Sequence, residues 1–175
     1  MGQKLEPGDR APNFDLPGVY GYKAGATSPS HEDGVRFKLK DYEGKKWVVL
    51  VFYHQDSSPE DTRLLVSFNG YNRKFTTKEI ELLAISQNGV NSHRQFIEVY
   101  QLGFSLVADE KKEVTDLYGV IREEKNQFDE LETRVHRTTM VIDKTGMIRN
   151  IWQDIEDLRE HPREVWEYIA KEKGV

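Results

Sequence analysis

Residues 47–68 constrain the fold of this chain more than any other stretch. They read WVVLVFYHQDSSPEDTRLLVSF, in which a near-continuous apolar run is followed by a short polar loop and then by apolar residues at a spacing of about 3.6. The first pattern is typical of a buried strand and the second of an amphipathic helix. We therefore expect a strand that leads directly into a helix, as in an open α/β sheet.

The loop between this strand and this helix is the first candidate for a functional site. In open α/β sheets, ligands and chemistry collect beyond the carboxyl end of such a strand, where the next helix presents its free N–H groups and the positive end of its dipole. Pro59 suits the first helical position and Ser58 suits the N-cap, so Asp61 is expected in the first turn. Residues 54–61 are therefore the expected site.

The rest of the chain alternates between strand and helix patterns. The sequence at residues 143–146 is a good hairpin turn between two strands, and His161 opens the last helix. Asn91 is expected to cap a helix that ends at Gly103 and in which Phe96, Val99 and Tyr100 share one face. The expected strands are 13–16, 81–86, 104–108, 136–143 and 147–153, and the expected helices begin near residues 59, 91, 114 and 161.

Two segments interrupt this alternation. Residues 19–36 are rich in glycine, serine and proline, which predicts a loop insertion. Within it, Tyr20, Tyr22 and His31 suit either a solvated loop or a lid or partner contact. Residues 122–134 are a charged run with few apolar side chains and are expected to form a solvated connection.

Residues 51–68 resemble, without gaps, the peroxiredoxins, and most closely those of the bacterioferritin comigratory protein type. In that family the strand ends in FYP and the loop reads P-x-x-x-T-x-x-C, where the cysteine is the peroxidatic one. This chain has His54 at the proline, Ser58 at the threonine and Asp61 at that cysteine. The resolving cysteine that many relatives carry falls on Val66, and the chain contains no cysteine anywhere.

The resemblance extends over most of the chain. Residues 4–18, 40–53 and 90–120 are similar, in order, to the family's opening segment, to its entry into the first long strand, and to its helix, strand and helix. Arg137, in HRTTMVID, matches the arginine that relatives place beside the peroxidatic sulfur. The resemblance implies an α/β, thioredoxin-like fold, with a mixed central sheet flanked by helices and an N-terminal peroxiredoxin-type extension, in a single domain over residues 1–175.

The usual activity of the family requires a thiolate. A helix N-terminus and a nearby arginine make that thiolate available near neutral pH, and peroxide oxidises it to a sulfenic acid. A carboxylate is a poor nucleophile toward a peroxide oxygen and has no such reversible oxidised state, but it can replace the thiolate's negative charge. We therefore expect a non-catalytic homologue of the thiol peroxidases, with a degenerate site formed by Ser58, Asp61 and Arg137 and with His54 at the loop start.

Three alternatives stay open. Asp61 resembles a cysteine sulfinate in charge and shape, and in the family that overoxidised form is linked to chaperone-like behaviour, so the chain could bind a protein partner. His54, Asp56 and Asp61 are candidates for a metal or acid/base site of a redox or peroxide-related enzyme, because imidazole and carboxylates suit a divalent metal. Ser58 and Arg137 could instead hold a small polar ligand.

The other histidines are expected outside the site. His136 neighbours Arg137 on a predicted strand, so alternation directs its side chain to the opposite face of the sheet. His93 and His161 lie at predicted helix starts, where we expect them to be solvated or to cap the helices. We predict neither a cofactor nor a bound metal.

Composition limits the class of partner. The chain has 175 residues, a formal net charge of -5 and a pI near 5.6. These values suit one domain with a sizeable core and argue against nucleic acid or an anionic membrane as the main partner. The sequence has neither an apolar run of membrane-spanning length nor a signal-peptide layout, so we expect a cytoplasmic protein, either a monomer or a homodimer.

Overall fold

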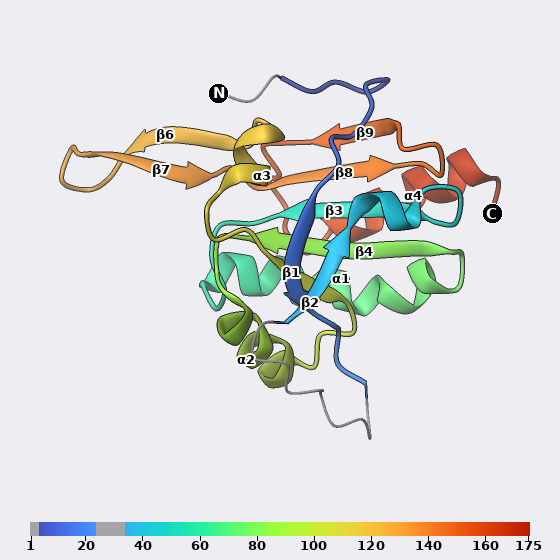
Figure 1. Ribbon diagram of the computed structural model, residues 1–175, viewed down its shortest axis with the longest axis horizontal. Helices are drawn as coiled ribbons and strands as arrows, with labels where there is room; N and C mark the ends of the chain where they lie inside the picture. Colours follow the sequence, from blue (N-terminus) through green and yellow to red (C-terminus); the bar gives the residue numbers. More distant parts are fainter. Residues whose placement is uncertain (1–3, 24–33) are drawn as a thin grey trace.

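A mixed sheet carries the fold in the computed structural model, which describes residues 4–23 and 34–175 (Figure 1). The strand order is β2-β1-β5-β4-β3-β8-β9, and β3 is parallel to β4 but antiparallel to β8. The strands of this sheet are β1 (Asp15–Val19), β2 (Val35–Lys38), β3 (Trp47–Phe52), β4 (Ile80–Ser86), β5 (Ser105–Ala108), β8 (Thr138–Ile142) and β9 (Ile148–Trp152). The helices are α1 (Pro59–Thr76), α2 (Val90–Tyr100), α3 (Glu113–Leu117), α4 (His161–Lys173) and the 3-10 helix η1 (Leu39–Tyr42).

Strand β3 lies inside the sheet and is buried on both faces. Val49 and Val51 contact the hydrophobic cluster on one face, whereas Leu50 and Phe52 contact the cluster on the other. No residue of β3 is more than 9% exposed. This burial explains the unbroken apolar run in the sequence, because the alternation of apolar and polar residues disappears when both faces of a strand are covered.

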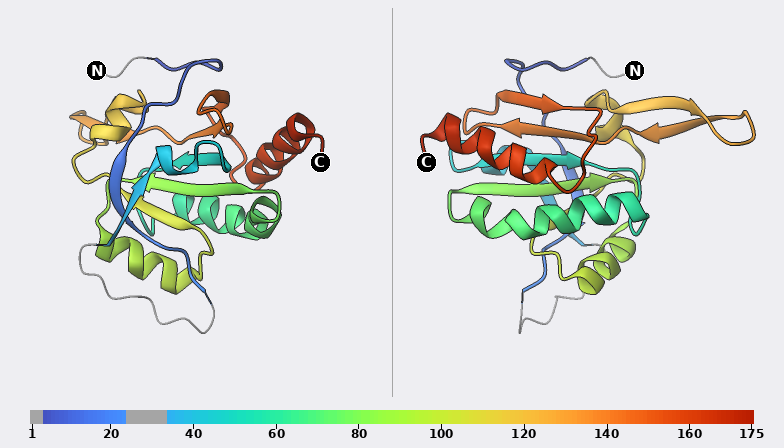
Figure 2. Two further views of the ribbon diagram at one scale, coloured as in Figure 1. Left: turned by 45° about the vertical axis from the view of Figure 1, so that its right-hand side comes forward. Right: turned by 180° about the vertical axis from the view of Figure 1, so that it is seen from behind.

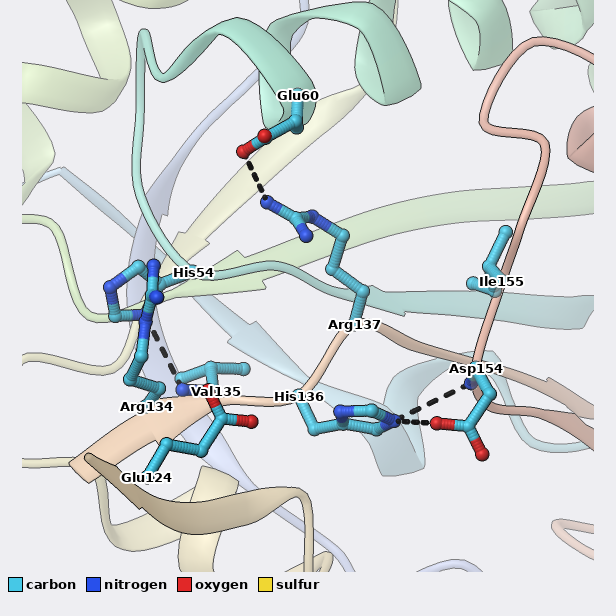
Figure 3. Close-up of a pocket in the computed structure, with 9 residues that line it drawn as sticks. All are labelled: His54, Glu60, Glu124, Arg134, Val135, His136, Arg137, Asp154 and Ile155. Carbon is cyan, nitrogen blue, oxygen red and sulfur yellow. Dashed lines mark hydrogen bonds and ion pairs between the residues drawn. The ribbon is translucent and has the colours of Figure 1, made fainter. Parts of the chain in front are cut away.

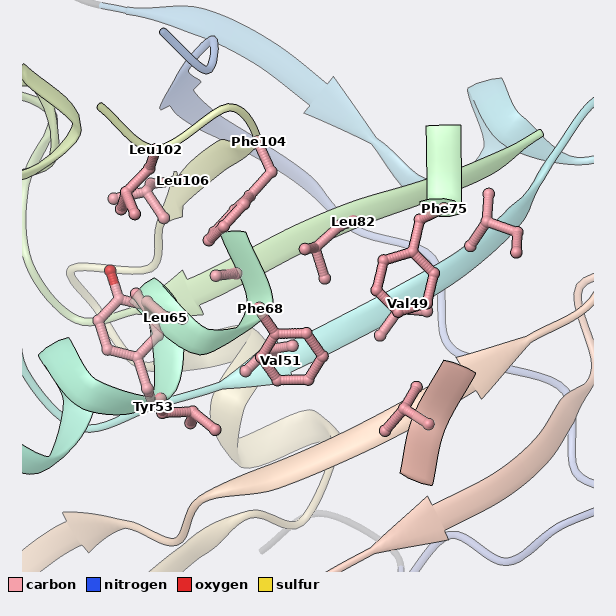
Figure 4. Packing of buried hydrophobic residues seen from close by; sticks show 14 of the residues in the cluster. Val49, Val51, Tyr53, Leu65, Phe68, Phe75, Leu82, Leu102, Phe104 and Leu106 are labelled. Carbon is pink, nitrogen blue, oxygen red and sulfur yellow. The ribbon is translucent and has the colours of Figure 1, made fainter. Parts of the chain in front are cut away.

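Helices α1, α2 and α4 cover one face of the sheet, and α3, η1 and the N-terminal segment cover the other (Figure 2). The predicted apolar stripe of α1 is present, since Leu64, Phe68 and Phe75 are fully buried in the cluster that contains Val49 and Val51. Figure 4 shows Phe68 and Phe75 beside these two valines. The other face of α1 is polar. No helix among the residues described combines the length and the apolar character that a bilayer crossing requires.

Strand β1 extends three residues beyond its predicted end at residue 16. It pairs with β2 on one side and with β5 on the other, and this second partner holds it in line to Val19. The approach to β5 requires a glycine at position 18, because a Cβ on Gly18 would lie 2.5 Å from the carbonyl oxygen of Leu106.

The predicted insertion at residues 19–36 is therefore too long at both ends. Val19 ends β1, and residues 35 and 36 already belong to β2. Tyr20 and Tyr22 are 55% and 38% exposed, whereas residues 24–33, which include His31, lie outside the described residues. A lid or partner contact at this loop stays a prediction.

The predictions for α2 were wrong at three points. Gly89, not Asn91, is the N-cap, and the helix stops before Gly103 because Gln101 adopts a left-handed conformation with φ of 50°. Val99 is 72% exposed. The buried side of α2 contains His93, Phe96 and Ile97, and Val99, two positions after Ile97, points away from that side.

Residues 122–134, expected to be a solvated connection, are exposed but are also largely strand. They form most of an antiparallel ribbon of β6 (Ile121–Lys125) and β7 (Leu131–Val135), which projects from the body (Figure 1). Asn126 organises the turn, since its side-chain oxygen accepts hydrogen bonds from the N–H groups of Phe128 and Glu130. The expected exposure is present, because the ribbon lacks the apolar alternation of a covered strand.

The predicted C-terminal hairpin and final helix are present. Strands β8 and β9 flank the turn at residues 143–146, and α4 begins at His161 and ends before Gly174. His161, however, is neither solvated nor a cap. It is 1% exposed, its Nε2 lies 2.8 Å from Thr139 Oγ1, and its ring packs edge-on against Phe68 and Trp152. Burial lowers the pKa of His161 from 6.5 to about 4.

The buried His161 predicts an acid-sensitive fold. At pH 7 the ring is neutral in the folded and unfolded states, so it contributes no pH dependence. Below pH 6.5 the unfolded chain binds a proton that the folded chain does not bind until about pH 4. We expect the free energy of unfolding to fall by about 3 kcal/mol from this group over that interval.

Chemical denaturation at pH 7 and pH 4.5 measures this loss. His161→Gln keeps a donor toward Thr139 but does not titrate, so its free energy of unfolding is expected to vary less with pH than that of the wild type. Equal pH dependence in both proteins would assign the acid sensitivity to other groups.

Candidate functional site

The site lies where β3 ends and α1 begins. Ser58 is the N-cap of α1, with extended backbone, and its Oγ accepts a hydrogen bond from the N–H of Asp61 at 3.3 Å. Pro59 is the first residue of the helix, where its missing N–H costs nothing. These two residues start the helix at one position, so that Asp61 projects from its first turn into the protein.

Asp61 is completely buried, and both of its carboxylate oxygens are occupied. Oδ1 accepts a hydrogen bond from Arg137 Nε at 2.7 Å. Oδ2 accepts one from Ser58 Oγ at 2.7 Å and one from the backbone N–H of Gln55 at 3.1 Å. The ion pair expected between Asp61 and Arg137 is therefore present, and with the loop N–H it completes the hydrogen bonding of the carboxylate.

Arg137 links this carboxylate to the surface. Its Nη2 lies 3.4 Å from Oε2 of Glu60, and its side chain is 28% exposed. Arg137 and His136 lie on the connection between β7 and β8 rather than on a strand, so strand alternation does not place their side chains. His136 instead turns toward Asp154, with its Nε2 3.0 Å from Oδ1 (Figure 3).

A polar hollow of about 300 Å³ opens beside Arg137. Ser58 and Asp61 do not line it, because their polar groups are directed to each other. The residues that line the hollow are His54, Glu60, Glu124, Arg134, Val135, His136, Arg137, Asp154 and Ile155 (Figure 3). Binding of a small polar ligand here would thus use Arg137 but not Ser58, and it stays a prediction.

His54 stands at the edge of this hollow. Its Nδ1 accepts a hydrogen bond from the backbone N–H of Val135 at 3.3 Å, which leaves the ring proton on Nε2. Partial burial, followed by the positive charge of Arg134, lowers the pKa of His54. The ring is therefore a neutral imidazole at neutral pH.

His54 and Asp56 do not point the same way, which contradicts the arrangement expected for a metal or acid/base site. Asp56 turns inward to Tyr53, just after β3, and to α2, whereas His54 turns to β7 and Asp61 to Arg137. Among the residues described, no group of three or more histidine and carboxylate side chains has the arrangement of a metal site.

Asp56 belongs to a buried network that the sequence did not predict. Its Oδ1 accepts a hydrogen bond from the Tyr53 hydroxyl at 2.5 Å, and its Oδ2 is 2.8 Å from Ser92 Oγ and 2.7 Å from His93 Nδ1. Tyr53 and His93 are completely buried, and Asp56 is 5% exposed. Burial, followed by the negative charge of Asp56, raises the pKa of Tyr53.

Both ring nitrogens of His93 have partners. Its Nε2 lies 3.1 Å from the carbonyl oxygen of Val107, which can only accept, and its Nδ1 faces the Asp56 carboxylate. His93 was expected to be solvated or to cap a helix, but Phe96 and Ile97 lie three and four residues further on and place it on the buried face.

The chain is similar in sequence to known proteins. The model of the AhpC/TSA family matches residues 7–151. The chain is 31% identical over 152 residues to the putative peroxiredoxin bcp of Coxiella burnetii, covering 87% of this chain and 91% of that protein. It is 27% identical over 160 residues to peroxiredoxin Bcp of Bacillus subtilis, covering 91% and 92%.

Solved structures share the fold. A cysteine-to-serine mutant of Xylella fastidiosa PrxQ superposes with a TM-score of 0.82 at 23% identity, over 98% of this chain and 99% of that chain. Peroxidoxin BcpB from Mycobacterium tuberculosis superposes with a TM-score of 0.77 at 22% identity, over 95% and 97%. The predicted thioredoxin-like fold of the peroxiredoxin type is confirmed.

The first prediction from the site concerns the Asp61–Arg137 pair. Arg137→Ala leaves a carboxylate buried without its cation, so the free energy of unfolding is expected to fall by about 3 kcal/mol. Glu60→Ala is the matched control, because it removes only the exposed partner of the same guanidinium and is expected to cost less than about 0.5 kcal/mol. Urea denaturation at pH 7 compares the two variants, and equal losses would contradict a special role for the buried contact.

The second prediction concerns Asp56. Asp56→Ala leaves the ring of His93 and the hydroxyl of Tyr53 buried without their acceptor, and it is expected to reduce the free energy of unfolding by about 3–5 kcal/mol. Ser92→Ala removes a single hydrogen bond to the same carboxylate and is expected to cost about 1 kcal/mol. A loss below 1 kcal/mol for Asp56→Ala in thermal and urea unfolding would show that the network contributes little.

Proposed function

Since this chain belongs to the AhpC/TSA family and contains no cysteine, we propose that it is a non-catalytic member without thiol peroxidase activity. One observation carries the proposal. Asp61, at the position where the family pattern has its peroxidatic cysteine, is fully buried with both carboxylate oxygens hydrogen-bonded. The chemistry of a carboxylate and the closure of the site both argue against peroxidase activity.

The chemistry of the family needs sulfur. A thiolate attacks one peroxide oxygen, the O–O bond breaks, water or an alcohol leaves after protonation, and the sulfur is oxidised to a sulfenic acid that a reductant can restore. Asp61 has no sulfur atom to accept that oxygen. Its carboxylate is also a poor nucleophile because its charge is neutralised by Arg137.

The donors of the site are engaged with the carboxylate. Arg137 Nε, Ser58 Oγ and the N–H of Gln55 all contact Asp61 at 2.7–3.1 Å. In an enzyme the same kind of donors would stabilise a thiolate and hold a peroxide. Here they stabilise a resident anion, so the groups that would serve catalysis serve the stability of the fold. Chaperone-like behaviour as a mimic of the overoxidised state stays a prediction.

Asp61→Cys tests the proposal directly. The purified wild type is expected to consume no hydrogen peroxide above the buffer rate in the presence of excess dithiol. Asp61→Cys is expected to form one sulfenic acid per chain, trapped with dimedone and counted by mass spectrometry. Because Arg137 and the N-terminus of α1 favour the thiolate, its rate at pH 7 should exceed that of free cysteine by about tenfold.

Asp61→Ser is the matched control, since it opens the same site without a thiol and is expected to stay silent. Asp61→Cys combined with Arg137→Ala is expected to fall back toward the rate of free cysteine. Peroxide consumption by the wild type, in proportion to its concentration and after removal of contaminating peroxiredoxins, would overturn the proposal.

A further inference from the structure

The projecting ribbon of β6 and β7 is the part of the described structure that the proposed function leaves unexplained. It pairs with no strand of the main sheet in the residues described, and it extends well beyond the body in two views (Figures 1 and 2). Phe128 in its turn and Leu131 beside it are each 72% exposed. A two-stranded ribbon in water is only marginally stable, so a contact that covers it would stabilise it.

The register of the ribbon places like charges opposite each other. Arg122 pairs with Arg134, and Glu124 pairs with Glu132. Because directly opposed residues share a face and alternate pairs return to it, these four side chains lie on one side of the ribbon, which we call the charged face. Like charges in such cross-strand pairs destabilise an isolated ribbon.

These charges find little compensation within the described chain. Arg122 reaches Asp154 at 3.8 Å across exposed side chains, which is a weak contact. The side chains of Glu124, Glu132 and Arg134 make no hydrogen bond and no ion pair within 4 Å in the parts of the chain that the structure describes. The charged face therefore presents a row of two arginines next to a row of two glutamates, and the weak contact of Arg122 with Asp154 is the one ion pair that these four side chains make in the described part of the chain.

We propose that the charged face is a self-association surface and that its partner is the charged face of a second copy of this chain. Consider a two-fold axis that is parallel to the face, perpendicular to the strands and midway between the two rows. Rotation about it gives a second copy whose charged face is opposed to that of the first and whose strands run in the opposite direction. This operation lays the arginine row of each copy over the glutamate row of the other. The contact is isologous, so one surface satisfies itself and a closed dimer results.

The same geometry brings the second copy to the hollow beside Arg137. The two charged rows are two residues apart, or about 7 Å along a strand. With the axis midway between them, the turn of the second copy lies about 7 Å beyond the arginine row of the first copy, on the side of the body and level with His136. That turn carries the exposed Phe128, and the hollow lined by His54, His136 and Arg137 would receive it.

The expected association is weak and electrostatic. A ribbon of two five-residue strands and a turn offers less contact area than the roughly 1,200 Å² of a stable interface. Its complementarity rests on exposed charges, which salt screens over about 10 Å at 0.1 M. A dimer with a dissociation constant in the micromolar range or above is therefore expected at low salt, and it should dissociate as salt is added. This inference does not depend on the loss of peroxidase activity.

Two charge-reversal variants test the pairing. Arg122→Glu with Arg134→Glu makes the face wholly acidic, and Glu124→Arg with Glu132→Arg makes it wholly basic. In sedimentation equilibrium at low salt, the wild type is expected to approach twice the 20.4 kDa of one chain as its concentration rises. Each variant alone is expected to stay monomeric, and an equimolar mixture is expected to form a heterodimer.

The chain with all four reversals restores the pattern with its rows exchanged, and it is expected to dimerise like the wild type. Because this rescue requires a folded ribbon, it separates a lost contact from a lost fold. Glu123→Arg, on the opposite face of the ribbon, is the control and should leave the association unchanged. A wild type that stays monomeric up to millimolar concentration, or reversal variants that associate as the wild type does, would overturn the proposal.

Discussion

The buried contact between Asp61 and Arg137 is the interaction on which the site depends. It joins the first turn of α1 to the connection before β8, across 76 residues of sequence. Asp61 is fully buried, so its charge would be costly without the guanidinium of Arg137. The pair therefore fixes α1 against the β7–β8 connection, and Arg137 then forms the wall of the hollow beside it.

A second buried pair holds the same loop from its other side. Asp56 is directed into the protein, where His93 of α2 and Tyr53 at the end of β3 receive it. The loop between β3 and α1 is thus held by two carboxylates that point in different directions and contact partners on different elements. The carboxylates of Asp56 and Asp61 therefore hold this loop in place. An anion at position 61 suits this site, because removing the charge would leave Arg137 with only the exposed Glu60 as an ionic partner.

The sequence predicted those parts of the fold and site that depend on local pattern. The apolar run of β3, the start of α1 at Ser58 and Pro59, and the place of Asp61 all follow from spacing and capping, which act within a few residues. His93 and His161 were misjudged because a helix start normally lies in water, and only the packing of α2 and α4 against the sheet buries these rings. The ribbon was missed because its charged residues lack the alternation that a covered strand shows.

The replacement of sulfur by a carboxylate also changes where specificity in this protein can reside. With Asp61 sealed by its donors, the centre of the site has no free group to offer a ligand, whereas the hollow next to it remains lined by His54, Arg137 and Glu60. The charged face of the ribbon continues from this hollow through Glu124 and Arg134, which line both. The proposed self-association therefore uses an exposed, polar surface. Because exposed charges act through their arrangement rather than through burial, a partner must match their order along the ribbon, and a second copy turned end over end does so.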